Sequence, residues 1–216
     1  MSRNSCKKIF FTSDWHIGHA NCLKFDNRPF ADIEEMHSVL IKRFNSTVPE
    51  NSVTYFLGDI GLCSKERTKE VIEKLNGTKV LVRGNHDGKM FAMYDIGFDV
   101  VVEKAQITLG QEIITMSHCP LLGIPREDLT GMRGAKEGDN WHGESRHGQS
   151  YAFEDFGQFH LHGHIHSGPE TSNKSKIMGR QYDVGVVAND YRPVSLSQIE
   201  KFIFETKKRE KMNGKN

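Results

Sequence analysis

Short apolar runs alternate with helical repeats along the first hundred residues of the chain. Three of these runs have the length of buried strands, at residues 7–12, 53–57 and 79–82. After the first, apolar side chains at helical spacing predict an amphipathic helix over residues 32–46, with Asp32 and Glu35 as its capping box. Two further helices are expected over residues 64–75 and 88–96. This alternation predicts an α/β arrangement for the first half.

The second half of the chain is richer in short strands. Apolar runs separated by turn residues predict strands at residues 100–102, 106–109, 112–116, 159–162 and 182–187. A last helix is expected over residues 197–208. We expect this half to be more antiparallel than the first. The whole is expected to form a single domain over residues 1–210, followed by a polar tail over residues 211–216.

One long segment without clear periodicity interrupts the second half. Residues 119–157 include seven glycines, many charged side chains and few aliphatic ones. A stretch of this kind is typical of a functional loop. Two interpretations stay open: a loop that folds over a site and selects the leaving group of a substrate, and a solvated insertion.

Charge and hydropathy exclude several classes of protein. The 216 residues include 29 Lys and Arg against 28 Asp and Glu, and this balance argues against an extended duplex nucleic-acid site. No apolar stretch approaches the roughly 20 residues that a membrane-spanning helix needs. The apolar core at residues 9–11 is too short for a secretory signal, so we expect a cytoplasmic protein without membrane association. The four cysteines have no paired spacing, which fits free thiols.

Five short motifs place metal-ligand side chains directly after apolar runs. They are Thr12-Ser13-Asp14-Trp15-His16, Gly58-Asp59, Gly84-Asn85-His86-Asp87, Ser117-His118 and His162-Gly163-His164-Ile165-His166. In open α/β sheets, the loops at the carboxyl ends of the strands meet in one crevice. We therefore expect seven side chains to converge there: Asp14, His16, Asp59, Asn85, His118, His164 and His166.

This set of imidazoles, carboxylates and one amide is a ligand set for first-row divalent metals. Seven ligands are too many for one tetrahedral ion, but they suit two ions that share a bridging carboxylate. Two such ions, a few ångströms apart, are a recurrent device for phosphoryl hydrolysis. We expect two divalent ions as cofactors, with manganese first and iron, zinc, nickel or cobalt as alternatives.

Taken in order, the five motifs resemble those of the calcineurin-like metallophosphoesterases. The pattern of that family runs D-x-H, G-D, G-N-H-D/E, H and G-H-x-H, and here it extends from Asp14 to His166. The flanking words SDWHIGHANCLKFDNRPF and DYRPVSL are similar to those of a small bacterial and phage subgroup. The resemblance implies a four-layer sandwich, in which two mixed β-sheets pack face to face with helices outside.

The resemblance also implies a role for each motif residue. One metal would be held by Asp14, His16 and His166, the second by Asn85, His118 and His164, and Asp59 would bridge both. His86 would act as general acid beside the ions, and Asp87 would orient His86 by accepting its other N–H. The implied reaction is hydrolysis of a phosphomonoester or phosphodiester by a hydroxide that bridges the two ions.

The substrate is a separate question from the metals. Arg83 resembles the phosphate-clamping arginine of the protein-phosphatase branch, and His19 is a second candidate for substrate contact. That branch also carries an arginine shortly after its G-D motif, whereas residues 60–63 here include none. A small nucleotide-like phosphoester is therefore favoured. The alternatives are a nuclease acting on short or single-stranded nucleic acid, a protein phosphatase and, least favoured, a non-catalytic metal-binding scaffold.

Three other histidines have structural interpretations. His160 and His162 continue the alternation toward His164, and we expect them to pack in the interior or touch solvent rather than bind metal. We expect His37 to lie on the surface of the first long helix. The sequence does not indicate an oligomeric state.

Overall fold

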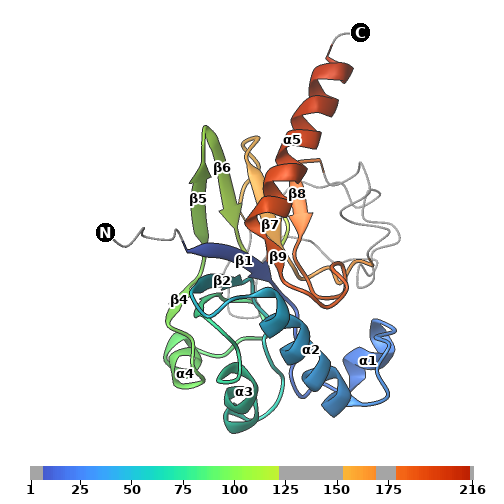
Figure 1. Ribbon diagram of the computed structural model, residues 1–216, viewed down its shortest axis with the longest axis vertical. Coiled ribbons are helices and arrows are strands. Elements are labelled where there is room, and N and C mark those ends of the chain that lie inside the picture. The colour runs from blue at the N-terminus through green and yellow to red at the C-terminus, as the bar shows by residue number, and fades with distance from the viewer. Residues whose placement is uncertain (1–6, 122–152, 169–178, 215–216) are drawn as a thin grey trace.

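A computed structural model describes residues 7–121, 153–168 and 179–214, and two sheets lie at its centre (Figure 1). The elements in chain order are β1 (Lys8–Thr12), α1 (Asn21–Phe25), α2 (Ile33–Thr47), β2 (Ser52–Phe56), α3 (Lys65–Ile72), β3 (Thr78–Val82), α4 (Met90–Asp95), β4 (Val100–Val102), β5 (Ala105–Leu109), β6 (Glu112–Met116), β7 (Phe159–His162), β8 (Gln181–Asp183), β9 (Val194–Ser195) and α5 (Leu196–Asn213). Most of the predicted long loop, residues 122–152, lies outside the described residues.

Both sheets are mixed. The first has the order β4-β3-β2-β1-β9, in which β1 to β4 are parallel and β9 runs antiparallel to β1. The second has the order β5-β6-β7-β8, in which only the β5–β6 hairpin is antiparallel. The prediction of a more antiparallel second half is therefore wrong for β6 to β8. Long connections precede β7 and β8, and connections of that length permit the crossovers that parallel strands require.

Alternate residues of the first sheet serve two apolar cores. Phe10 points toward the helices, where it joins Met36 and Phe44 of α2. Phe11, the next residue, joins Met116 and Phe159 of the second sheet in a core between the two sheets. This alternation follows the period of two along a strand. It confirms the expected α/β fold of two mixed sheets flanked by helices.

The helix ends agree with the capping signals in part. The Asp32 carboxylate accepts hydrogen bonds from the N–H groups of Glu34 and Glu35, at 2.9 and 2.8 Å. The Glu35 carboxylate accepts from the N–H of Ala31, so the expected capping box is shifted by one residue. Helix α3 is capped by Ser64 as predicted but ends at Ile72, before the expected residue 75.

Helix α5 is longer than predicted. It begins with a capping box between Ser195 and Gln198 and continues to Asn213, so residues 211–213 of the expected tail are helical. Its buried face, which includes Ile199 and Ile203, packs against the core between the sheets. Its last turns project beyond the sheets in Figure 1. Among the described helices, none has the length and apolar character needed to span a membrane.

Candidate metal centre

The carboxyl ends of five strands deliver the predicted ligands to one edge of the molecule. Because β1, β2 and β3 are parallel neighbours, the residues that follow them leave the first sheet on the same side. The segments after β6 and β7 meet them there, and the N–H of Gly163 donates to the carbonyl of His118 at 2.9 Å. A parallel bridge between Ser13 and Gly185 joins the two sheets at this edge. The motifs thus converge across both sheets.

The backbone turns sharply at the ligand positions. Five of the seven predicted ligands have left-handed φ angles, although none of them is glycine: Asp14 at 59°, His16 at 51°, Asp59 at 54°, His164 at 71° and His166 at 47°. Such conformations cost on the order of 1–3 kcal/mol each and persist only where the surrounding structure enforces them. The backbone strain is therefore concentrated at residues whose side chains must converge on the candidate metal centre.

One group of possible metal ligands consists of Asp14, His16 and His166, whose ligand atoms lie within 4.8 Å of one another. The Nε2 atoms of His16 and His166 are 2.9 Å apart, and the Nε2 of His166 lies 3.5 Å from Asp14 Oδ1. Asp14 and His16 are almost fully buried, at 1% and 4% exposure. These are the residues that the resemblance assigns to the first metal.

A second group consists of Asp59, His118 and His164, again within 4.8 Å of one another. His164 Nδ1 lies 3.0 Å from His118 Nε2, which in turn is 3.4 Å from Asp59 Oδ2. The N–H of His164 donates to the carboxylate of Asp14, so the two groups share a backbone contact. Two of the ligands predicted for the second metal are therefore in place.

The carboxylate of Asp59 lies between the two groups. Its Oδ2 atom is 3.4 Å from His118 Nε2 and 3.9 Å from His16 Nε2, one imidazole from each group. Asn85, the seventh predicted ligand, lies next to His86, whose N–H donates to the other oxygen of Asp59. The side-chain oxygen of Asn85 is buried and accepts no hydrogen bond within the described part of the chain. A buried amide oxygen in this state fits a bound cation.

The charges of the centre are balanced by two of its histidines. Burial raises the pKa of Asp59, but the neighbouring His118 outweighs it and holds the pKa well below its ordinary value. Burial lowers the pKa of His118, but Asp59 outweighs that effect and raises it to about 9. His166 responds in the same way to Asp14 and Asp26, with a pKa of about 10. Burial lowers the pKa of His16 to about 4.

Two glycines leave room for the buried carboxylates. A Cβ added at Gly84 would lie 2.4 Å from Asp59 Oδ1, and one added at Gly163 would lie 2.3 Å from Asp14 Oδ2. Neither glycine has a positive φ angle. Both positions therefore require glycine for close approach of the carboxylates.

Sequence reasoning missed two residues that hold the first ligand group. The carboxylate of Asp26 accepts from Nδ1 of His166 at 3.0 Å, and this bond orients the ring so that Nε2 faces the centre. Arg28 donates to the same carboxylate and to the backbone carbonyls of Asp14 and Trp15. Both residues belong to the flanking word that suggested the subgroup, but the spacing carried no sign of these contacts.

His86 lies beside the centre, whereas Asp87 makes other contacts than the one expected. The side chain of His86 is half exposed, and its Nε2 is 3.9 Å from Asp59 Oδ2. The Asp87 carboxylate makes no bond to His86. Instead it accepts from the N–H groups of Asp59, Ile60 and Gly84 at 2.8 to 3.0 Å. Asp87 therefore ties the loop after β2 to the loop after β3, and the expected contact with His86 is replaced by these three.

The two predicted substrate-binding residues lie in different surroundings. The guanidinium of Arg83 is buried and forms an ion pair with Glu103, beside β4. The ring of His19 is partly exposed and its centre lies 6.0 Å from that of His16. His19 is thus placed at the rim of the centre, whereas a phosphate contact by Arg83 would require its pair with Glu103 to open. Both roles remain predictions.

Three further histidines in the described part of the chain lie outside the ligand groups and make interior contacts. His160 is fully buried and bonds to Thr115 and Ser117, and burial lowers its pKa to about 3. His162 is also buried, and its Nδ1 bonds to the carbonyl of Gly163. The expectation that His37 lies on the surface is wrong. It is 3% exposed and accepts from the N–H of Gly18 at 3.0 Å, because its face of α2 packs against the loop after β1.

The chain belongs to the calcineurin-like phosphoesterase family, whose pattern it matches over residues 7–168. This span includes all seven predicted ligands. The resemblance drawn from the motifs is thereby confirmed. Members of this family generally bind divalent metals, and the chain has two groups of residues suited to them.

Relatives come from a phage and from two other organisms. The gene 66 protein of Mycobacterium phage L5 is 32% identical over 201 residues, which cover 83% of this chain and 86% of that protein. An uncharacterised protein of Methanocaldococcus jannaschii is 48% identical over 86 residues, which cover 38% of this chain and 48% of the relative. A protein of unknown function from Aquifex aeolicus superimposes with a TM-score of 0.63 at 22% identity, over 91% of this chain and 99% of that one. The last likeness shows the fold alone.

The new role of Asp87 can be tested by stability. Asp87→Ala leaves three buried N–H groups without an acceptor, so the free energy of unfolding should fall by about 2–3 kcal/mol. His86→Gln, which changes a half-exposed side chain, should alter it by less than about 0.5 kcal/mol. Urea denaturation of both variants with a chelator present measures the difference. Equal stabilities for the two variants would contradict the role of Asp87 in holding the loops after β2 and β3 together.

Proposed function

We propose that the chain is a binuclear metal-dependent phosphoester hydrolase. The observation that carries the proposal is the position of Asp59 Oδ2, within 4 Å of an imidazole nitrogen from each ligand group. One carboxylate between two sets of ligands is the arrangement that two neighbouring cations require. Membership of the phosphoesterase family supports the same reaction class.

The donor atoms fit the cations. Asp14, His16 and His166 would hold one, and Asn85, His118 and His164 the other, with Asp59 shared. Imidazole nitrogen with carboxylate and amide oxygen suits manganese, iron, zinc, nickel or cobalt, and we place manganese first. Two bound cations would supply Lewis-acid activation of a water molecule and of the phosphoryl oxygens.

The residues around the cations would divide the remaining work. His86 presents a half-exposed imidazole beside Asp59, at a position suited to giving a proton to the leaving oxygen. Asp87 holds the two loops that carry Asp59 and Asn85 at a constant separation. Asp26 keeps the His166 ring turned toward the centre.

A pocket next to His86 indicates the size of the substrate. Its volume is about 340 Å³, and His86 and Asp87 form part of its wall. The rest of the lining is mostly apolar, with Leu62, Ala92 and Met93 among it. Because the pocket adjoins the group that protonates the leaving oxygen, we assign the organic leaving group to it. A pocket of this volume favours a small phosphomonoester or phosphodiester, such as a nucleotide, over a phosphoprotein.

Metal content tests the ligand assignment with a matched pair of variants. His118 and His160 are equally buried, but only His118 belongs to a ligand group. Elemental analysis of reconstituted protein should find two divalent ions per chain in the wild type and in His160→Gln, and at most one in His118→Gln. Asp59→Asn should bind both ions more weakly, because it removes a charge shared by them. Two ions in His118→Gln would contradict the assignment.

Turnover measurements distinguish a general acid at His86 from a metal ligand. His86→Gln should keep the metal content of the wild type and lower kcat by roughly 10²–10⁴-fold, the scale of one general acid. The defect should shrink for p-nitrophenyl esters, whose leaving group needs little protonation. Steady-state kinetics with alkyl and p-nitrophenyl phosphoesters measures it. A defect of equal size for both kinds of ester would argue against proton transfer by His86.

The pocket assignment predicts a change in leaving-group preference. Ala92→Phe narrows the pocket, and Leu62→Ala widens it. The ratio of kcat/KM for 1-naphthyl phosphate over phenyl phosphate should fall about tenfold in the first variant and rise or stay level in the second, the scale of one apolar contact. Metal content should be unchanged in both. A ratio that is the same in the three proteins would place the leaving group elsewhere.

A further inference from the structure

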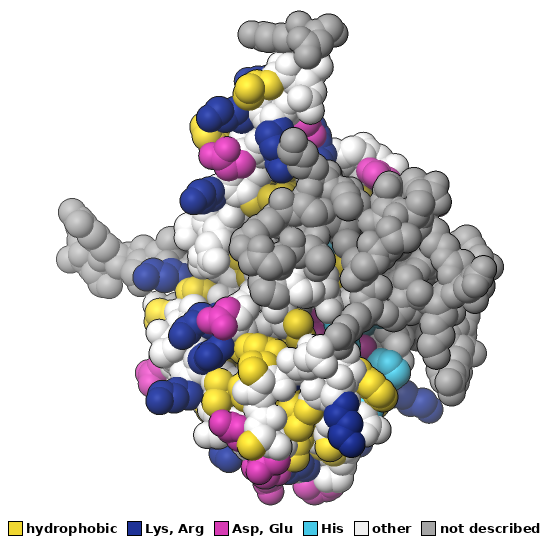
Figure 2. Space-filling view, turned by 90° about the vertical axis from the view of Figure 1, so that its right-hand side faces the viewer, with side chains coloured by type: hydrophobic (Ala, Val, Ile, Leu, Met, Phe, Trp, Pro, Cys, Tyr) yellow, Lys and Arg dark blue, Asp and Glu magenta, His cyan; other side chains and the backbone are white. Residues whose placement is uncertain are grey.

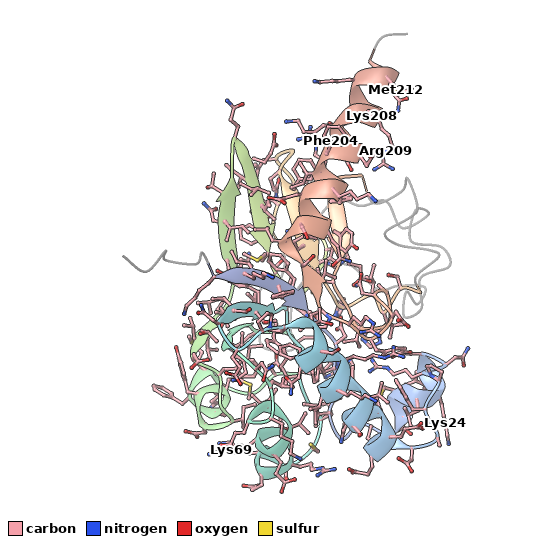
Figure 3. The ribbon with its side chains drawn as sticks, in the orientation of Figure 1. Lys24, Lys69, Phe204, Lys208, Arg209 and Met212 are labelled. Atoms are coloured by element: carbon pink, nitrogen blue, oxygen red, sulfur yellow. The ribbon has the colours of Figure 1, made fainter. Side chains whose placement is uncertain are left out.

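The projecting half of α5 carries exposed apolar side chains that the core does not use. Ile199, Ile203 and Thr206 are buried against the body of the protein. Phe204 and Met212 are 66% and 65% exposed. Figure 3 labels Phe204 about halfway along the helix and Met212 near its end, beyond the sheets, and Figure 2 shows hydrophobic, basic and acidic side chains mixed along the helix.

These side chains belong to one ridge with an ordered sequence of charges. Glu200, Phe204, Lys208 and Met212 follow one another at intervals of four residues, and all four are exposed. Side chains at this interval form a ridge on the surface of a helix, and two such ridges pack at about −50° in the commonest class of helix contact. From its N-terminal to its C-terminal end, the ridge therefore presents an acidic, an apolar, a basic and an apolar side chain.

The charges on either side of Phe204 allow two copies of the ridge to pair favourably only when the two helices run antiparallel. Glu200 and Lys208 lie four residues on either side of Phe204. When two copies of the helix run antiparallel and cross at Phe204, each glutamate meets the lysine of the other copy. When they run parallel, glutamate meets glutamate and lysine meets lysine, which is unfavourable.

A groove lies beside the ridge. It has a volume of about 860 Å³ and runs along α5 from Glu200 to Met212, with Leu109 and Gly110 of the β5–β6 hairpin on its other side. An ion pair between Lys207 and Glu112 joins the hairpin to the helix beside this groove. Glu200 lies at one end of the groove, and Lys208 and Lys211 lie toward the other.

We propose that two copies of the chain associate through α5, with the helices antiparallel and crossing at Phe204. Phe204 of each copy packs on the partner's Phe204 and borders the partner's groove, and two symmetric pairs form between Glu200 and the partner's Lys208. A two-fold axis relates the copies, so every contact occurs twice. An acidic peptide or an anionic lipid surface fits less well, because Glu200 lies in the same ridge as Lys208. The association does not depend on the catalytic proposal.

Charge reversal and its rescue test the pairing. Sedimentation velocity of the full chain over a dilution series should show a species of twice the 24.6 kDa of one chain. Glu200→Lys and Lys208→Glu should each weaken the dimer by at least about tenfold, because symmetry doubles each like-charge contact. The double variant Glu200→Lys/Lys208→Glu should restore it. Phe204→Asp should abolish the dimer in every background.

Two control variants separate pairing from net charge. Glu205→Lys and Arg209→Glu make the same charge changes about 100° and 140° around the helix from Phe204, and should leave the dimer intact. Far-UV circular dichroism checks that each variant is folded. A wild type that stays monomeric throughout would overturn the proposal. So would a double variant that is no better than the single ones, or control variants that dissociate as readily as the ridge variants.

Discussion

The burial of two carboxylates within one small volume is the constraint on which the rest of the site depends. Asp14 and Asp59 are 1% and 2% exposed, and the charge of Asp59 makes the charged form of Asp14 less favourable. A buried charge is stable only when it is paired and hydrogen-bonded. The imidazoles of His118 and His166 lie beside these carboxylates, and backbone N–H groups donate hydrogen bonds to them. The left-handed ligand residues and the glycines of close approach are the means by which the chain reaches this arrangement.

The location of the site could be predicted because it follows from a rule of topology. Parallel strands end at the same edge of a sheet, so ligand types placed directly after β1, β2 and β3 had to meet. The strands themselves were visible as apolar runs, since strands buried on both faces are mostly apolar. The pairing within the second sheet was misjudged, because turn signals say nothing about the crossovers before β7 and β8.

The supporting contacts could not be predicted because they join residues with no local relation. Asp26 reaches His166 across 140 positions of the chain, and Asp87 reaches Ile60 across 27. His37 follows the buried Met36 in α2, but only the folded structure shows that the His37 ring accepts a hydrogen bond from the N–H of Gly18. The ion pair of Arg83 is a further contact that the sequence did not reveal. The place of Arg83 before the Gly84 turn suggested a phosphate contact, whereas its buried guanidinium is paired with Glu103.

Each ligand group draws on both sheets. Asp14 and His16 follow β1 of the first sheet, whereas His166 follows β7 of the second. Asp59 follows β2, whereas His118 and His164 follow β6 and β7. A cation held by either group would therefore act as a cross-link between the two sheets, and it would add its binding free energy to the stability of their packing. The edge that holds the candidate metal centre would then also hold the two sheets in their relative position.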